Sequence, residues 1–259
     1  MRFGGRLIAT ISAIPPHARI PIEKHTSIIF PDWGKDDRKR FIKANLQHFG
    51  QNMMEMYNIA NFAKRQDRFH VSGPGLGVLI SQKDQGKGAV CVSGHFGQWE
   101  AIRAYMNAND MQMAGLYKKH SNKYYEAMFG KALNFSGPMF HTGVRGMAGL
   151  VRILKSGRFI SLLHDQKVEG APLLDFLGKP AHTSTAAAEL ALKYDVPLIP
   201  IYGIRRENGY DYDIIVEAPV TQSDPETMAK NMNQSLAEMI VRHPEQWLWI
   251  YDRWHQFTE

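Results

Sequence analysis

Cysteine is almost absent from this sequence. Cys91 is the one cysteine among 259 residues. A single thiol excludes an intramolecular disulfide framework and any zinc or iron–sulfur site built from several cysteines. The composition therefore favours a protein of a reducing compartment.

Long hydrophobic runs are also missing. No stretch approaches the roughly 20 apolar residues that cross a bilayer, and the nearest, residues 7–14, is closed by two prolines. Arg2 and Arg6 precede it, but no clear small-x-small cleavage site follows, which makes a signal peptide the minor alternative. We interpret residues 1–20 as a short amphipathic segment that lies on a membrane surface.

Common catalytic motifs are lacking as well. The chain has no Gly-x-Ser-x-Gly elbow and no Gly-x-x-x-x-Gly-Lys phosphate loop, and residues 73–77 lack the third glycine of a dinucleotide site. Cys91 as a thiolate served by His95 fails on distance, because four strand residues separate the two by about 13 Å. We therefore expect no covalent serine chemistry and no nucleotide cofactor, and a buried, inert thiol.

The charge is moderately positive. Formal net charge is +6, 44% of the residues are hydrophobic and 22% are charged. An excess of this sign favours anionic partners, such as nucleic acid, acidic proteins, phosphorylated lipids or an anionic bilayer surface. Because Lys and Arg are scattered among acidic residues and form no stripe, we expect no nucleic-acid partner. A non-enzymatic nucleic-acid or membrane binder stays open as a different class, which salt-sensitive DNA binding would favour.

Short apolar runs alternate with helical patterns beyond residue 75. Strands are predicted at 89–93, 115–117, 158–163 and 196–204, and helices at 98–106, 124–132 and 186–194. Asn208-Gly209 before 210–216 predicts a tight antiparallel hairpin. The fold class is therefore α/β, a mixed, mainly parallel sheet flanked by helices. No linker or repeat divides the chain, so residues 1–259 are predicted to form a single domain.

Helices are predicted at both ends of this α/β region. Residues 35–64 carry apolar side chains at three- and four-residue steps, with a break expected near Gly50. Residues 223–226, Ser-Asp-Pro-Glu, form a predicted capping box that starts a helix ending by Pro244.

The most informative motif lies in the turn after the strand at 89–93. His95 sits there between two glycines, and Glu100 follows five residues later. In a continuous helix residues five apart diverge by about 140°. With His95 in the turn and Glu100 just inside the helix, the carboxylate can orient the imidazole and leave the other ring nitrogen as a base. The alternative is a turn histidine beside a glutamate that the helix dipole favours.

Three further clusters carry polar side chains suited to a site. Arg145 stands between glycines, where it can bind phosphate or carboxylate, or simply be a solvated charge. His164, Asp165 and Gln166 end an apolar strand, where open α/β sheets carry their sites, although Asp165 can also cap the next turn. Residues 244–255 are rich in aromatic side chains, which suit a membrane interface, a ligand mouth or the edge of a core.

These clusters, in this order, resemble the late acyltransferases of bacterial lipid A biosynthesis, the lauroyl/myristoyl family related to glycerolipid acyltransferases. The resemblance runs from about Pro31 to Arg253. It rests on the His-x4-acid motif at His95 and Glu100, Gly-x-Arg at Arg145, Asp165-Gln166 after a strand, Phe-Leu-Gly-Lys-Pro-Ala from 176, the helix start at Thr183, and Pro-Glu-Gln-Trp-Leu-Trp from 244 with Arg253.

The resemblance implies transfer of a fatty acyl chain from acyl carrier protein to a hydroxyl of a lipid A precursor. His95 is then the general base and Glu100 its orienting acid, and the hydroxyl attacks the thioester directly. Arg145 is expected to bind phosphate or developing negative charge, with Asp165, Gln166 and Arg253 also on the substrate side.

The resemblance also sets where the protein should work. It implies no metal and no cofactor. Because the implied acceptor is a lipid and no segment is long enough to span a bilayer, we expect a peripheral position on the cytoplasmic face of the bacterial inner membrane, bound to an anionic lipid surface. Family members usually begin with one membrane-spanning helix, and many carry an Asn-Pro and a further arginine between the first two motifs. Here 121–125 read Ser-Asn-Lys-Tyr-Tyr, and Lys131 follows. Recognition of the acceptor is therefore expected to differ.

Two alternatives stay within enzymes. One is an acyltransferase of the same architecture that acts on another phospholipid or a phosphorylated glycolipid. The other is a metal-dependent hydrolase built on His95, His164, Asp165 and His182, for which no paired ligand spacing is present. Metal analysis of the purified protein separates the second from the first.

Overall fold

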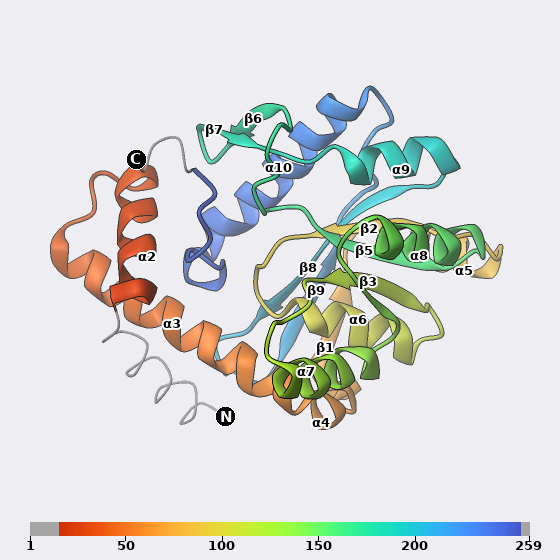
Figure 1. The fold of residues 1–259 in the computed structure, drawn as a ribbon, viewed down its shortest axis with the longest axis horizontal. Coiled ribbons are helices and arrows are strands. Elements are labelled where there is room, and N and C mark those ends of the chain that lie inside the picture. The colour runs from red at the N-terminus through yellow and green to blue at the C-terminus, as the bar shows by residue number, and fades with distance from the viewer. Residues whose placement is uncertain (1–15, 255–259) are drawn as a thin grey trace.

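The computed structural model describes residues 16–254, which are built around a seven-stranded sheet (Figure 1). The strand order is β1-β9-β8-β2-β5-β3-β4. The pair β8·β9 is antiparallel and the other neighbours are parallel. The strands are β1 Phe69–Ser72, β2 Val90–Ser93, β3 Met113–Tyr117, β4 Met139–His141, β5 Phe159–Leu163, β8 Leu198–Arg205 and β9 Tyr212–Val216. This confirms the predicted α/β class with a mixed, mainly parallel sheet.

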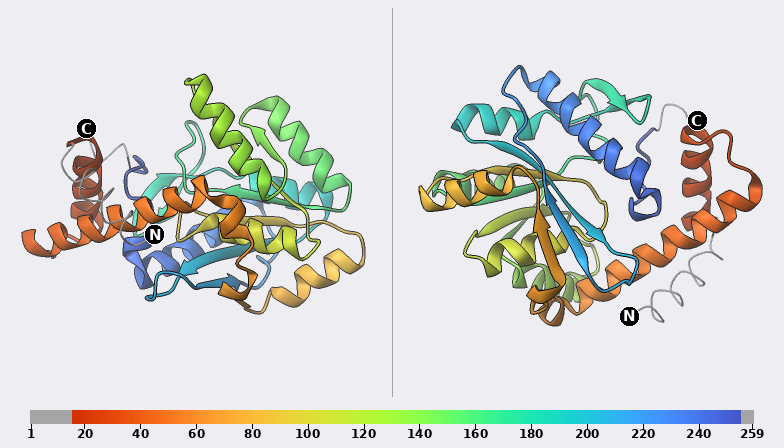
Figure 2. Two further views of the ribbon diagram at one scale, coloured as in Figure 1. Left: turned by 90° about the horizontal axis from the view of Figure 1, so that it is seen from below. Right: turned by 180° about the vertical axis from the view of Figure 1, so that it is seen from behind.

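Helices cover both faces of the sheet, and a small antiparallel hairpin of β6 Leu173–Phe176 and β7 Lys179–His182 stands apart. Figure 2 shows α3 as a long helix along one side of the molecule, with α2 beside it. The helices are α2 Pro16–Ile29, α3 Lys35–Tyr57, α4 Ile59–Ala63, α5 Leu76–Asp84, α6 Trp99–Ala108, α7 Lys123–Phe135, α8 Val144–Lys155, α9 Ala186–Tyr194 and α10 Pro225–Arg242, with 3-10 turns Gln66–Arg68 and Pro244–Gln246.

The central strand β2 explains how the two cores form. All four of its residues are buried, as expected for a parallel strand covered on both faces. Cys91 packs with α5 and α6 in one core cluster, whereas Val90 and Val92 pack with α8, α9 and α10 in another. Successive side chains of a strand point to opposite faces. The alternation therefore fixes β2 in the middle and leaves its carboxyl end free to carry a site.

Several local expectations need correction. Helix α3 continues through the buried Gly50 and ends at Tyr57, because the next residue, Asn58, has a φ of −116° that is not helical. The cap of α10 is Asp224, which accepts the Thr227 N–H at 2.9 Å, so Ser223 is not the capping residue. The predicted hairpin is confirmed, but its strands end at Arg205 and resume at Tyr212 and are therefore joined by a longer loop than a two-residue turn.

The membrane-surface segment expected at 1–20 lies mostly outside the described residues. Within 16–254, none of the helices has the length and apolar character that crossing a bilayer requires.

Candidate active site

The turn that carries His95 is fixed by its backbone. His95 follows β2, and the chain then bends at Gly97, whose φ of +57° favours glycine. A Cβ atom at Gly97 would stand 2.0 Å from the carbonyl oxygen of Gly203. The Gly97 N–H donates to the carbonyl of Gln246 at 2.9 Å, and the Leu248 N–H donates to the carbonyl of His95 at 2.9 Å. The strand β8 and the segment after α10 therefore hold the turn from two sides.

The imidazole of His95 is paired with Asp165. Its Nδ1 lies 2.8 Å from Asp165 Oδ1, and the backbone N–H of His95 donates to Asp165 Oδ2 at 2.7 Å. The indole N–H of Trp247 donates to the same Oδ2 at 2.8 Å. Because an ionised carboxylate only accepts, this contact assigns the proton of the neutral ring to Nδ1 and the lone pair to Nε2. His95 is thus arranged as a base, with its side chain 13% exposed.

Asp165 is a buried carboxylate that stays ionised. Its side chain is 1% exposed. Burial opposes ionisation, but the neighbouring His95 and the hydrogen bonds from His95 and Trp247 outweigh it and hold the pKa of the carboxyl below its usual range. The pair therefore combines a fixed negative charge with an accessible imidazole. Trp99 and Tyr251 contact the ring edge-on, with centroids 5.4 and 4.9 Å away.

Glu100 does not contact His95, which corrects the expected pair. Its carboxylate accepts from Arg103 Nη1 at 2.8 Å, and both side chains are almost fully buried. Arg103 also donates to the carbonyl of Gly137 at 2.8 Å. Glu100 lies in the first turn of α6, whose rotation turns its side chain away from the preceding turn. Glu100 therefore pairs within α6, and its partner Arg103 ties α6 to the segment after α7.

Arg145 and Gln166 lie exposed at the same edge of the sheet as His95. Arg145 is at the start of α8, directly after β4, and forms no hydrogen bond or ion pair with the described residues. Gln166 follows Asp165 and lies next to the Tyr251 hydroxyl. Since β2, β5, β3 and β4 are parallel neighbours, their carboxyl ends meet at one edge. Three strand spacings separate Arg145 from His95 by about 14 Å or more.

Arg253 is inside the protein, contrary to its expected place on the substrate side. It is 1% exposed. Its guanidinium donates to the carbonyl of His182 and, at 2.7 Å, to Thr183 Oγ1. Burial lowers its pKa to about 10. Arg253 therefore fastens the end of the described chain to β7 and to Thr183, which follows it.

The remaining residues considered for chemistry, Cys91, His164 and His182, lie in surroundings typical of structural residues. Cys91 is fully buried, and burial raises the pKa of its thiol to about 12. The Nδ1 of His164 lies 3.1 Å from the Ser93 carbonyl, and that of His182 lies 2.6 Å from the Ala171 carbonyl. Across residues 16–254, no three His, Cys, Asp or Glu side chains gather closely enough to hold a metal ion. His95, His164 and His182 therefore do not belong to one metal-binding group within these residues.

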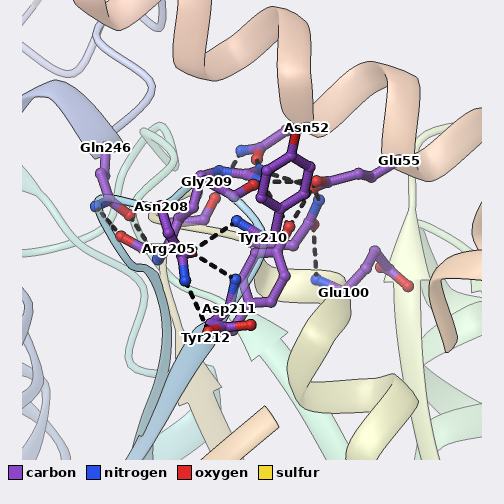
Figure 3. A network of polar contacts seen from close by, with 12 residues as sticks. Asn52, Glu55, Glu100, Arg205, Asn208, Gly209, Tyr210, Asp211, Tyr212 and Gln246 are labelled. Atoms are coloured by element: carbon purple, nitrogen blue, oxygen red, sulfur yellow. Dashed lines mark hydrogen bonds and ion pairs between the residues drawn. The ribbon is translucent and has the colours of Figure 1, made fainter. Parts of the chain in front are cut away.

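A buried polar network centred on Glu55 and Arg205 (Figure 3) contacts the turn. Glu55 of α3 accepts from Arg205 at 2.6 and 2.7 Å and from Gln98 Nε2 at 2.6 Å. Asn52, one helical turn earlier, donates to the carbonyl of Gly97 at 2.6 Å. The paired members of such a network strengthen one another, although Arg205 Nε is buried without a hydrogen-bond partner. It joins α3 and β8 to Gly97 and Gln98, the two residues that follow His95 and Phe96 in the turn.

Sequence reasoning missed two residues of the site. Trp247 and Tyr251 belong to the aromatic segment after α10, and the pattern indicated a core edge or a ligand mouth without distinguishing them. Trp247 contributes to the core and to the site. Its ring is 1% exposed and packed in a core cluster, while its N–H donates to Asp165. No spacing in the sequence links Trp247 to Asp165, which lies 82 positions earlier.

The fold and this edge define an α/β enzyme class in which a histidine base, paired with a carboxylate, lies at the carboxyl end of a central parallel strand. The model of the family described as bacterial lipid A biosynthesis acyltransferase matches residues 2–256, and the chain belongs to this family.

Relatives of known name agree with this assignment. The chain is 22% identical over 224 residues to a lipid A biosynthesis acyltransferase of Haemophilus influenzae, covering 85% of this chain and 70% of the relative. It is 24% identical over 235 residues to the lipid A biosynthesis palmitoleoyltransferase of Escherichia coli, covering 89% and 76%. It is 21% identical over 240 residues to the E. coli lauroyltransferase of the same biosynthesis, covering 90% and 77%. Acyl transfer in lipid A biosynthesis is therefore supported.

Proposed function

We propose that the protein transfers a fatty acyl chain from acyl carrier protein to a hydroxyl group of a lipid A precursor. The observation that carries this proposal is the pairing of His95 Nδ1 with the ionised Asp165, which leaves Nε2 as a base at an exposed edge of the sheet. The family assignment supplies the acyl chemistry. The acyl carrier protein donor and the direct mechanism are inferences from the resemblance stated above.

The reaction is written as one displacement at the thioester carbonyl. His95 Nε2 takes the proton of the acceptor hydroxyl while its oxygen forms a bond to the thioester carbon. The carbon–sulfur bond then breaks, and the imidazolium returns the proton to the leaving sulfur, so a thiol departs and the base is regenerated. Asp165 holds the ring in this tautomer and stabilises the imidazolium that forms. No covalent intermediate on the protein is needed.

Arg145 is assigned to the acceptor. It is a free, exposed guanidinium at the edge that carries His95, and its planar fork suits a phosphate group. A phosphorylated acceptor is thereby favoured. An acyltransferase acting on another phospholipid or phosphorylated glycolipid uses the same contact, so it is the second candidate. Because either acceptor is a lipid, we place the protein peripherally on an anionic membrane, at the cytoplasmic face of the bacterial inner membrane.

Mass spectrometry of lipids tests the proposal. The protein is expressed in a bacterium that lacks its own late acyltransferases, beside the variant His95→Ala. We expect an added acyl mass on lipid A with the wild type and none with the variant, because loss of a general base costs about 10²–10⁴ in rate. Added mass on another phospholipid selects the second candidate. Equal acylation by both proteins contradicts the role of His95.

A further inference from the structure

The loops that follow β3 and β4 form an exposed surface beside the proposed active site. Tyr117 and His141 are paired in register at the ends of these strands, and the Thr142 N–H donates to the carbonyl of Tyr117 at 2.9 Å. Two loops therefore leave the sheet side by side, and helices α7 and α8 begin where they end. We define the β3–β4 edge surface by six exposed residues, Lys118, Lys119, Lys123, Tyr124, Val144 and Arg145.

The charge of this surface has one sign. Within 118–128 and 142–145 the one carboxylate is Glu126, and its side chain is 15% exposed. Glu126 is turned inward, where it accepts from the Tyr117 hydroxyl at 2.7 Å and from the His120 N–H at 2.8 Å and contacts His141 at 2.9 Å. Four cationic side chains therefore face solvent without an acidic side chain from these loops beside them.

Two apolar side chains project from the same surface. Tyr124, in the first turn of α7, is 90% exposed, and Val144, the first residue of α8, is 89% exposed. Single exposed apolar residues are common, but these two stand among cations at neighbouring loop ends. Tyrosine with its polar tip suits the headgroup region of a bilayer, and insertion there requires no complementary pocket.

The loop after β3 is held in one shape. Glu126 fixes the backbone of His120, whose ring contacts Tyr125 edge-on with centroids 4.6 Å apart. The side chain of Asn122 accepts from the N–H groups of Tyr124 and Tyr125 at 3.0 and 3.1 Å and so caps α7. A preformed surface loses little conformational freedom when it binds.

We propose that the β3–β4 edge surface docks on an anionic phospholipid bilayer and so turns the edge that carries His95 toward the membrane. The lysines meet the lipid phosphates, and Tyr124 and Val144 enter the headgroup layer. This proposal deepens the proposed function, because a lipid acceptor has to reach His95 from the bilayer. An acidic protein such as the acyl donor is the competing partner for the lysines.

Sedimentation with lipid vesicles tests the surface. The full chain is mixed with vesicles of phosphatidylglycerol and phosphatidylcholine, or of phosphatidylcholine alone. The variant Lys118→Gln/Lys119→Gln/Lys123→Gln removes three charges from the surface. The control Lys87→Gln/Lys155→Gln/Lys193→Gln removes three exposed charges at the opposite edge, where the chain enters β2, β5 and β8. Thermal unfolding verifies that both variants fold.

We expect the surface variant to bind anionic vesicles about 100-fold more weakly, since each well-placed lysine contributes about fivefold. The control should stay within about threefold of the wild type. The variant Tyr124→Ser should reduce the fraction retained at 0.5 M salt, where attraction between charges is screened to about 4 Å. Equal loss in both triple variants, or no loss in either, overturns the proposal.

Two further measurements separate the outcomes. If the surface variant keeps its vesicle binding but loses binding to acyl carrier protein, the surface serves a protein partner and the bilayer proposal is wrong. Activity on acceptor dispersed in detergent tests the proposed function by itself. A wild type inactive there contradicts the proposed function, whereas vesicle binding still decides the docking surface.

Discussion

Replacing Asp165 by asparagine should remove the base without removing the histidine. The carboxylate accepts three donors, the His95 N–H, the His95 Nδ1–H and the Trp247 indole N–H, at 2.7 to 2.8 Å. The first and third share Oδ2. An amide has one acceptor oxygen and one donor nitrogen. It satisfies the most partners with its oxygen in the place of Oδ2 and its NH₂ group toward Nδ1.

In that orientation the amide donates to His95 Nδ1, so the ring proton moves to Nε2. The lone pair that should accept the proton of the acceptor hydroxyl is then gone. We expect kcat to fall by about 10²–10⁴, which corresponds to about 3–5 kcal/mol of transition-state stabilisation. Steady-state acyl transfer measures the loss, and nitrogen NMR of the labelled imidazole reports the tautomer.

Glu100→Gln is the matched control. Its carboxylate is as buried as that of Asp165, but it pairs with Arg103 and not with His95. Removing a partner of a buried ion pair costs about 3–5 kcal/mol of stability, so this variant should unfold at lower urea concentration while kcat of the folded fraction stays within about threefold. If Asp165→Asn retains kcat, or Glu100→Gln loses as much as Asp165→Asn, the assignment of the base and its partner is wrong.

Three other perturbations probe the remaining contacts. Arg145→Ala should raise KM for a phosphorylated acceptor about 10- to 100-fold, which is the contribution of a charged hydrogen bond, and Arg145→Lys should have a KM between those of the wild type and Arg145→Ala. An equal KM in the wild type and both variants would show that Arg145 is only a solvated charge. Trp247→Phe keeps the ring but removes the donor to Asp165, so kcat should fall less than in Asp165→Asn and shift its pH profile; an unchanged profile would show that the indole N–H is idle. Burial lowers the pKa of His48 to about 3, so the unfolded chain binds a proton first and stability should decline as pH falls from about 6.5 toward 3, by up to about 1.4 kcal/mol per pH unit. His48→Gln should flatten this decline in urea unfolding at several pH values, and identical slopes would contradict a neutral buried His48.

The sequence identified the position of the base better than its partner. Strand and turn chemistry around His95 are local, so the apolar run and the flanking glycines sufficed to place it at a strand end. The partner is not local, because Asp165 is 70 residues away and meets His95 through the pairing of β5 with β2. A carboxylate five residues from the histidine looked nearer along the chain. Strand order, which no single segment encodes, decides between the two.

Arginine roles were equally hard to predict from residue type. Arg145 and Arg253 are both expected to contact substrate, yet one is exposed and the other is 1% exposed and bonded to Thr183. The difference lies in what packs around each. Arg253 follows an aromatic segment that folds into a core cluster, where its guanidinium lies over the ring of Phe176. Arg145 lies at the start of α8, directly after the short edge strand β4, and its side chain stays exposed to water.

The hydrogen bond between Trp247 and Asp165 has a consequence for the order in which this chain is made. The strands β2 and β5 leave the ribosome well before residues 244–254, and chains acquire structure from the amino-terminal side during synthesis. Until the last segment arrives, the bridge between Phe96 and Trp247 is absent and Asp165 lacks one of its three donors. Contacts between such distant segments form slowly. In a growing chain the sheet can therefore form long before His95 and Asp165 are fully organised. The proposed base becomes functional only after the last segment has been synthesised and has folded.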